Sequence, residues 1–84
     1  MLERITGPYR GHYIASYACP VGERMQYHGF AKVCRREPAS YWEATEVVQK
    51  LSAADWSDTA QGALDAAEEV ARMSIANRVP AEAL

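Results

Sequence analysis

The stretch DTAQGALDAAEEVARMSIANR, residues 58–78, decides the fold of this chain. Its small and apolar residues recur at steps of three and four, which is the period of an α-helix with one dry face. These residues are Ala60, Ala63, Leu64, Ala67, Val70, Ala71, Ser74 and Ile75, and the charged Asp65, Glu68, Glu69 and Arg72 fall mostly on the opposite side. Such a helix needs a surface to cover its apolar face, and we expect the preceding residues to supply it.

The ends and the polar side of this helix are also marked in the sequence. Asp58 is the predicted N-cap and begins a capping-box pattern, with Ser57 as the alternative cap. Glu68 and Arg72 lie four residues apart, a pairing worth about 0.2–0.5 kcal/mol. Pro80 follows the helix and is expected to help stop it.

The length and composition indicate one small globular domain. The chain has 84 residues, so we expect a single domain spanning residues 1–84 with an ordered core at about residues 9–78. Hydrophobic residues make up 49% and charged residues 24%, which argues against disorder. No apolar run approaches the roughly 20 residues that cross a bilayer, and the first residues lack the hydrophobic core of a signal peptide. We therefore expect a cytoplasmic protein without a membrane partner.

The net charge of −2 hides an asymmetry along the chain. Residues 1–40 carry six Lys or Arg and three Glu, whereas residues 41–84 carry three Lys or Arg and eight Asp or Glu. Two solvated faces of opposite sign are the simpler interpretation. A basic binding surface backed by an acidic helix is the functional one.

Two segments before the helix have the composition of strands. In residues 9–19, tyrosine and isoleucine alternate with small residues, and residues 20–23 supply turn geometry with Pro and Gly. Residues 24–36 form the second segment, which we expect to pair with the first as a hairpin. Within it, Gly29 indicates a bulge or a close backbone approach.

Residues 41–51 fit two descriptions. Ser40 and Glu43 match a capping box, and the apolar residues that follow also fit helical spacing. Against a helix, Val47 and Val48 are β-branched and the segment also alternates. A lone hairpin is marginal in water and a third strand makes a usable sheet, so we predict a strand here.

The predicted fold is therefore α+β, with a three-stranded antiparallel β-sheet packed against one long C-terminal α-helix in the order β-β-β-α. If residues 41–51 form a helix, the alternative is a β-hairpin with two helices. The helix carries mostly small side chains, so we expect it to lie close to the sheet, with the strands supplying the large side chains. No predicted element covers the sheet face turned away from the helix, and we expect any function there.

The two cysteines, Cys19 and Cys34, are kept apart by the predicted hairpin. With a turn near residues 22–23, Cys19 lies opposite Gln26 and Cys34 lies opposite Gly11. These rows are separated by roughly 25 Å, at about 3.3 Å per strand residue. A disulfide needs Cα atoms within about 7 Å, so we predict two free thiols.

No motif in the sequence specifies a chemical reaction. His12, Cys19, His28 and Cys34 could ligate a metal, but their spacing matches no zinc pattern. A Gly-rich phosphate loop is absent from the sequence, and nothing near the Cys–His pairs would orient the histidine or mark an oxyanion hole. We therefore predict no catalytic residue, no metal, no cofactor and no enzymatic activity.

Basic and aromatic residues are interleaved on the predicted hairpin, and such a face can bind a protein or stack nucleic-acid bases. They are Arg10, Arg24, Lys32, Arg35 and Arg36 with Tyr9, Tyr13, Tyr17, Tyr27 and Phe30. We predict a non-catalytic module that binds a protein partner or itself, because Tyr, Trp and Arg are the usual anchors of interfaces. Nucleic-acid binding is the alternative, disfavoured by the sequence pI of about 5.6. The predicted binding surface consists of Arg10, Tyr13, Tyr17, Tyr27, Lys32 and Arg35.

Three motifs carry a family resemblance. They are Tyr-Arg-Gly-His-Tyr-Ile at residues 9–14, Gly-Phe-Ala-Lys-Val at residues 29–33 and Ala-Leu-Asp-Ala-Ala-Glu-Glu-Val-Ala-Arg at residues 63–72. Through them, over about residues 9–78, the chain resembles small single-domain proteins of unknown function that are frequent in β-proteobacteria. The resemblance implies a β-β-β-α fold and no known activity. A fainter similarity to three-stranded plant DNA-binding domains, which also begin near Tyr-Arg-Gly and end in an Ala-rich helix, is one of fold.

Overall fold

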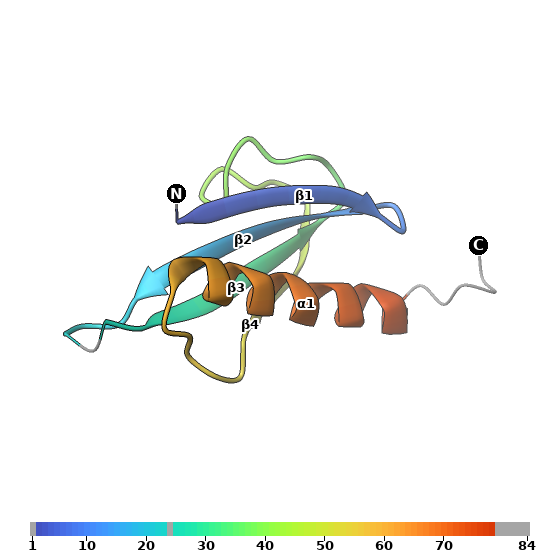
Figure 1. The fold of residues 1–84 in the computed structure, drawn as a ribbon. Helices are drawn as coiled ribbons and strands as arrows, with labels where there is room; N and C mark the ends of the chain where they lie inside the picture. The colour runs from blue at the N-terminus through green and yellow to red at the C-terminus, as the bar shows by residue number, and fades with distance from the viewer. Residues whose placement is uncertain (1, 24, 79–84) are drawn as a thin grey trace.

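The protein is a four-stranded antiparallel sheet with one helix packed on it. The computed structural model describes residues 2–23 and 25–78. Within them the strands are adjacent in chain order, as β1 (Glu3–Tyr9), β2 (His12–Pro20), β3 (Tyr27–Cys34) and β4 (Val47–Ser52), followed by α1 (Ala60–Arg78) (Figure 1). The α+β class, the antiparallel sheet and the long C-terminal helix are confirmed. The prediction of three strands is wrong, as is the alternative of a hairpin with two helices.

The strand missing from the prediction is β1. It pairs with β2 through a two-residue turn at Arg10 and Gly11, whose φ angles are 50° and 81°. Positive φ at both central residues is the geometry of tight hairpin turns, because its twist matches that of the flanking strands. The segment predicted as the first strand therefore contains this turn. The Gly7-Pro8 pair, which resembles a turn in the sequence, lies inside β1.

The hairpin of β2 and β3 turns one residue later than predicted. Cys19 consequently lies opposite His28, and Cys34 lies opposite Tyr13, so the predicted partners Gln26 and Gly11 are wrong. The two rows remain far apart along the strands. Both cysteines are free thiols, as predicted.

Residues 41–51 are divided between a loop and β4. The capping-box contact is present, because the Glu43 N–H donates to Ser40 Oγ at 3.1 Å, but only a turn follows it. A helix does not continue, since the N–H and C=O of Tyr41 bond to side chains of β1 and β3. The strand prediction is therefore correct only from Val47 onward. The preceding residues belong to a loop that spans residues 35–46, the 35–46 loop.

Helix α1 lies close to the sheet because small residues meet at the contact. A Cβ on Gly29 would overlap the carbonyl oxygen of Ala63, which confirms the close backbone approach predicted there. On the helix, Ala63, Ala67 and Ala71 have no exposed surface. The larger side chains of this core are Ile14, Val33, Leu51, Leu64 and Ile75, and three of these five come from strands. We call the sheet face that contacts α1 the inner face.

The helix begins one residue later than its predicted cap implies. Thr59 Oγ1 accepts a hydrogen bond from the Gly62 N–H at 2.9 Å, which makes Thr59 the N-cap. The Asp58 carboxylate instead accepts a bond from Gln26 Nε2 at 3.3 Å. The predicted role of Pro80 in stopping the helix lies outside the described residues.

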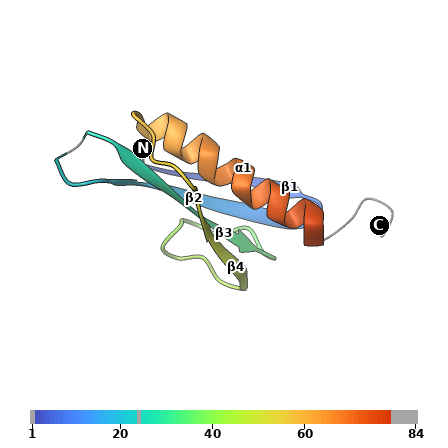
Figure 2. The same ribbon diagram turned by 90° about the horizontal axis from the view of Figure 1, so that it is seen from below.

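The face turned away from α1, which we call the outer face, is partly covered. Figure 2 shows α1 and the 35–46 loop on opposite sides of the sheet. Beneath the loop, Ala15 and Cys34 have no exposed surface, and Tyr41 of the loop is only 9% exposed. The expectation of a bare outer face is therefore wrong, because the 35–46 loop folds back over β2.

Candidate binding face

Six aromatic rings form a continuous strip across the outer face, which we call the aromatic strip. In spatial order they are Trp42, Tyr41, Tyr17, Phe30, His28 and Trp56. The middle rings stand on β2 and β3, the first two come from the 35–46 loop, and the last comes from the connection between β4 and α1. Four separate parts of the chain thus supply one surface.

The rings form two groups of contacts at the distances typical of aromatic pairs, and Tyr17 and Phe30 join the groups as partners in the sheet. Trp42 meets the Tyr17 ring edge-on, with centroids 4.9 Å apart and an interplanar angle of 67°. Tyr17 lies directly opposite Phe30 in the sheet, so the two side chains share the outer face. The centroids of Phe30 and His28 are 4.3 Å apart, and those of His28 and Trp56 are 6.3 Å apart.

The 35–46 loop is fixed over the sheet through the backbone of Tyr41. Its N–H donates to the Glu3 carboxylate at 2.7 Å, and its C=O accepts a bond from Lys32 Nζ at 2.8 Å. The same ammonium lies 4.2 Å from the centroid of the Tyr41 ring and 5.8 Å from that of Trp42. Hydrogen bonds to charged groups contribute about 1.5–3 kcal/mol each, so the loop and its tryptophan are held in place.

Both ends of the aromatic strip reach solvent. Trp42 is 65% exposed and Trp56 is 44% exposed, whereas the rings between them are buried or half-buried. Two lysines lie beside the strip, since Lys32 of β3 stands directly opposite the exposed Lys50 of β4 in the sheet. The outer face therefore presents two large apolar rings, with positive charge near Trp42.

Burial holds two titratable groups of the outer face, Cys34 and Tyr41, in their neutral forms. Burial raises the pKa of the Cys34 thiol, and the neighbouring Lys32 charge offsets only part of this rise. Burial also raises the pKa of Tyr41, with a further contribution from Tyr17. A buried neutral thiol is a poor nucleophile and a poor metal ligand, because both roles require the thiolate.

The remaining thiol and imidazole of the outer face are bonded to backbone carbonyls. His28 Nε2 lies 3.2 Å from the Ala53 oxygen, and Nε2 must donate there because a carbonyl can only accept. Cys19 Sγ donates weakly to the Pro20 oxygen at 3.6 Å. Among residues 2–23 and 25–78, no three His, Cys, Asp or Glu side chains lie together as a metal site would require.

Three of the six residues of the predicted binding surface lie on the outer face. Tyr13, Tyr17 and Lys32 stand there, and the last two contact the loop residue Tyr41. Tyr27 is on the inner face instead, packed against the core around Ala18. The reason is strand alternation, which turns its side chain opposite to those of the residues on either side.

The other two predicted residues lie at the ends of strands. Arg10 is in the β1–β2 turn, with its guanidinium carbon 5.7 Å from the centroid of the Tyr9 ring, and Tyr9 packs on the inner core. Arg35 is exposed just beyond β3, and its N–H donates to the Glu46 oxygen at 3.2 Å. Neither is part of the strip, so the six predicted residues do not form one surface.

Five of the six rings of the strip are absent from the predicted surface, which contains only Tyr17 of the six. Trp42, Trp56 and His28 are absent from the predicted surface, as are Phe30 and Lys50. The available signal was the position of both tryptophans in segments that are polar or rich in turn residues, where a large apolar side chain has little core to join. Their meeting at one face depends on the path of two loops, which periodicity does not reveal.

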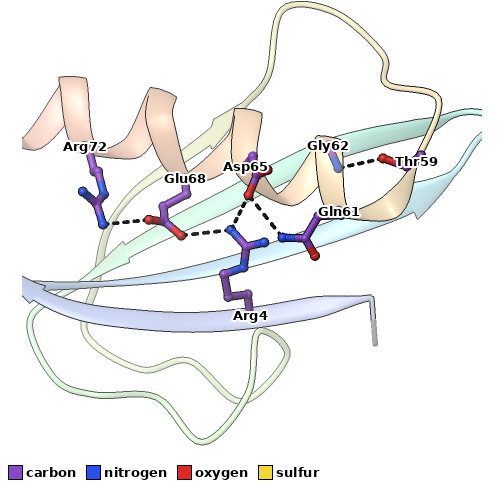
Figure 3. Close-up of polar contacts among 7 residues, drawn as sticks. All are labelled: Arg4, Thr59, Gln61, Gly62, Asp65, Glu68 and Arg72. Atoms are coloured by element: carbon purple, nitrogen blue, oxygen red, sulfur yellow. Dashed lines mark hydrogen bonds and ion pairs between the residues drawn. The ribbon is translucent and has the colours of Figure 1, made fainter.

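Charged residues on the inner side fasten β1 to α1. Arg4 of β1 lies 2.9 Å from Asp65 and 3.2 Å from Glu68, and Arg72 lies 2.8 Å from Glu68 as the predicted four-residue pair (Figure 3). Burial alone lowers the pKa of Arg4, but the hydrogen bonds that its guanidinium donates to Asp65 and Glu68 and the charges of these carboxylates outweigh burial, so the net pKa is raised. Part of the predicted solvent side of the helix therefore holds the sheet.

Comparison of the chain with protein-family models, with curated proteins and with solved structures found no match. Within the described residues, no helix combines the length and the apolar character that spanning a membrane requires. A proposal of function therefore rests on the geometry of the outer face.

Proposed function

We propose that this protein is a non-catalytic binding module that docks a partner protein through the aromatic strip of its outer face. The observation that carries the proposal is the exposure of Trp42 and Trp56, at 65% and 44%, on one face of the sheet. Exposed tryptophans cost free energy in water, roughly 25 cal/mol per Å² of apolar surface, and this cost is recovered when a partner covers them. Tryptophan and tyrosine are also the residues most enriched at the energetic centres of protein interfaces.

The strip is ordered before any partner arrives, which favours tight docking. Tyr17 and Tyr41 hold the Trp42 ring from two sides, with centroid distances of 4.9 and 5.0 Å. Lys32 and Glu3 hold the backbone beneath that ring. A side chain that is already ordered loses less conformational entropy on binding, so more of the contact energy contributes to affinity.

The polar groups of the outer face support binding rather than catalysis. The only fully buried thiol, Cys34, has a raised pKa, and His28 and Cys19 are bonded to backbone oxygens. Free thiols in both cysteines are also consistent with a partner in the cytoplasm, where thiols stay reduced.

A photocrosslinking experiment tests the proposal. A benzophenone amino acid would replace Trp42 or Trp56 in turn, and in a control protein it would replace Met25, which is 86% exposed in the β2–β3 connection. We expect the same discrete covalent protein adduct from the first two positions and none from the third. The proposal fails if positions 42 and 56 give no adduct, or if position 25 gives the same one.

Nucleic-acid binding is the second candidate. It is favoured by the two positive charges of Lys32 and Lys50, which stand opposite each other in the sheet beside the rings. Bases stack on aromatic side chains while lysines neutralise phosphates. Titration with short single-stranded DNA and RNA at low salt distinguishes the two functions. Amide and indole NMR shifts at Trp42, Trp56 and Lys50 that vanish as salt is raised would favour nucleic acid, whereas their absence would favour the protein partner.

A further inference from the structure

A groove lies between α1 and residues 53–57, the connection that also carries Trp56 at one end of the aromatic strip. Residues 53–57 are tied to β3 at both ends, because the Ala53 N–H donates to Gly29 at 2.9 Å and Ser57 exchanges two backbone bonds with Tyr27. Between this segment and the flank of α1 runs a groove of about 290 Å³. Ligand pockets span about 300–1,000 Å³, so the groove accommodates one or two side chains.

The floor of the groove is apolar and incompletely covered. Ala53 comes from the connection, and Ala66, Val70 and Met73 come from α1 at a spacing of four and three residues. Such spacing places the three helical residues on one stripe. Met73 is 60% exposed, and a methionine adapts readily to apolar side chains of different shapes.

Each wall of the groove carries one carboxylate. Asp55 lies on the connection and Glu69 on the helix, and both are exposed. Within the described residues, neither of these two carboxylates takes part in a hydrogen bond or an ion pair. This differs from the neighbouring Asp65 and Glu68, which are paired with Arg4.

Three basic side chains of the described residues are engaged elsewhere. Arg72 is paired with Glu68, Arg36 with Glu46, and Lys32 is bonded to the loop over the outer face. An apolar floor between two unpaired carboxylates is complementary to an apolar side chain flanked by a cation. The long stems of Lys and Arg also pack well on apolar surface while their charged ends reach the rim.

We propose that this groove binds a peptide segment of a partner protein in which a Lys or Arg stands next to a Leu, Ile, Met or Phe. The apolar side chain packs on Ala66, Val70 and Met73, and the cation lies between Asp55 and Glu69. The groove adjoins one end of the aromatic strip, because Trp56 lies between Asp55 and Ser57 in the same connection. Its apolar floor and Glu69 come from α1, so the proposal does not depend on the function proposed for the strip.

Selection from a random octapeptide display library on the immobilised full chain tests the proposal. We expect the selected peptides to combine Lys or Arg with a neighbouring large apolar residue. In the NMR spectrum of labelled protein, the best synthetic peptide should shift the amides of Ala54, Ala66 and Val70. Its affinity should fall as salt is raised, because the carboxylates are exposed.

Charge reversal at the walls provides the decisive comparison. The double variant Asp55→Lys with Glu69→Lys should weaken the peptide by about tenfold or more, since like charges then face each other. The control, Glu23→Lys with Glu37→Lys, changes the net charge equally at exposed sites away from the groove and should keep the affinity. Thermal melts followed by circular dichroism establish that both variants fold.

Four outcomes would overturn the inference. These are a selection that yields no peptide, selected peptides that lack a cation, equal loss of affinity in both double variants, or loss of affinity on replacing Trp42, which lies at the far end of the aromatic strip, when the groove variant keeps it. A concentration-dependent dimer that only the groove variant dissociates would assign the groove to a second copy of this chain. Each of these results would overturn the inference about the groove only. The proposal for the aromatic strip is tested separately, by its crosslinking experiment.

Discussion

Gly29 shows how a single residue sets the distance between the two layers. Its missing Cβ leaves room for the carbonyl oxygen of Ala63, which lies against the strand backbone. This close contact lets the small helical residues Ala67 and Ala71 be completely buried on the sheet. The sequence indicates a bulge or a close backbone approach at Gly29, because a glycine inside a strand is typical of both, and the structure has the close approach.

Replacing Gly29 with alanine should destabilise the fold by about 1–3 kcal/mol, the usual cost of overpacking a core. Chemical denaturation measures the loss, and NMR should show the amides of Ala63 and Ala67 shifted. Gly11→Ala is the control, because an added Cβ there meets nothing and only the φ of 81° is strained. Gly11→Ala should leave those helical amides unchanged. Wild-type stability in the Gly29→Ala protein would contradict the packing described.

At the scale of elements, sequence periodicity identifies α1 well and its first residue less well. The small-residue stripe predicts both the helix and its buried face, since a 3.6-residue repeat is a local property. The cap is ambiguous because Ser57, Asp58 and Thr59 are all good capping residues, and only the hydrogen bond from Gly62 selects Thr59. Strand β1 is missed because Gly7-Pro8 has the composition of a turn.

The choice of cap can be tested with two alanine substitutions. Thr59→Ala should lower the free energy of unfolding by about 0.5–2 kcal/mol, the range for lost N-caps. Asp58→Ala should lower the free energy of unfolding less, because the Asp58 carboxylate only accepts a solvent-exposed hydrogen bond of 3.3 Å from Gln26 Nε2. Urea denaturation of both variants decides, and a larger loss in Asp58→Ala would make Asp58 the cap.

The pairing of Arg4 with Glu68 should contribute measurably to stability. Their side chains are 23% and 14% exposed, so solvent screens the pair less than one on the surface. A double-mutant cycle with Arg4→Met and Glu68→Gln should give a coupling of about 1 kcal/mol. The matched control is Arg36 with Glu46, at 75% and 46% exposure, where the coupling should stay below about 0.5 kcal/mol. Equal couplings in both cycles would show that burial does not strengthen the inner pair.

The 35–46 loop should loosen when its bond to β1 is removed. In Glu3→Ala the Tyr41 N–H loses its carboxylate acceptor, and its hydrogen exchange should quicken by about tenfold, equivalent to 1.4 kcal/mol. Glu37→Ala is the control, since Glu37 is an exposed residue of the same loop. Unchanged exchange at Tyr41 in the Glu3→Ala protein would mean that Lys32 alone fixes the loop.

Taken as a whole, the molecule buries two neutral acidic groups on its outer face, the Cys34 thiol and the Tyr41 phenol, and this gives its stability an alkaline limit. Burial raises the pKa of Cys34 above 9.0 and that of Tyr41 above 10.0, their ordinary values. As pH rises through those values the unfolded chain releases protons that the folded chain still holds, so the free energy of unfolding falls. Below pH 9.0 the contribution is fully present.

The Cys34→Ala variant should therefore lose stability less steeply above pH 9.0 than the wild type does. Denaturation curves collected from neutral pH to about pH 10.5 measure the two slopes, which are compared instead of the absolute stabilities. Cys19→Ala keeps the buried thiol and should retain the wild-type slope. Identical slopes in the wild type and in Cys34→Ala would show that the buried thiol does not set the limit.

The location of the candidate site is the least predictable property of the whole molecule. Strand alternation places Tyr17 and Lys32 on one face, but it cannot show that Trp42 and Trp56 arrive there from two loops. Loop paths depend on long-range bonds such as that from Tyr41 to Glu3, thirty-eight positions earlier in the chain. A sequence pattern with a period of two or 3.6 residues carries no information about such bonds.

Oxidative footprinting in cells tests whether a partner covers the aromatic strip. Hydroxyl radicals label exposed Trp and Met side chains, so labelling can be compared between the purified protein and the protein inside cells that naturally produce it. We expect Trp42 and Trp56 to be labelled in the purified protein and protected in cells, whereas Met25, at 86% exposure, should be labelled equally in both. Equal labelling of both tryptophans in the two settings would contradict it.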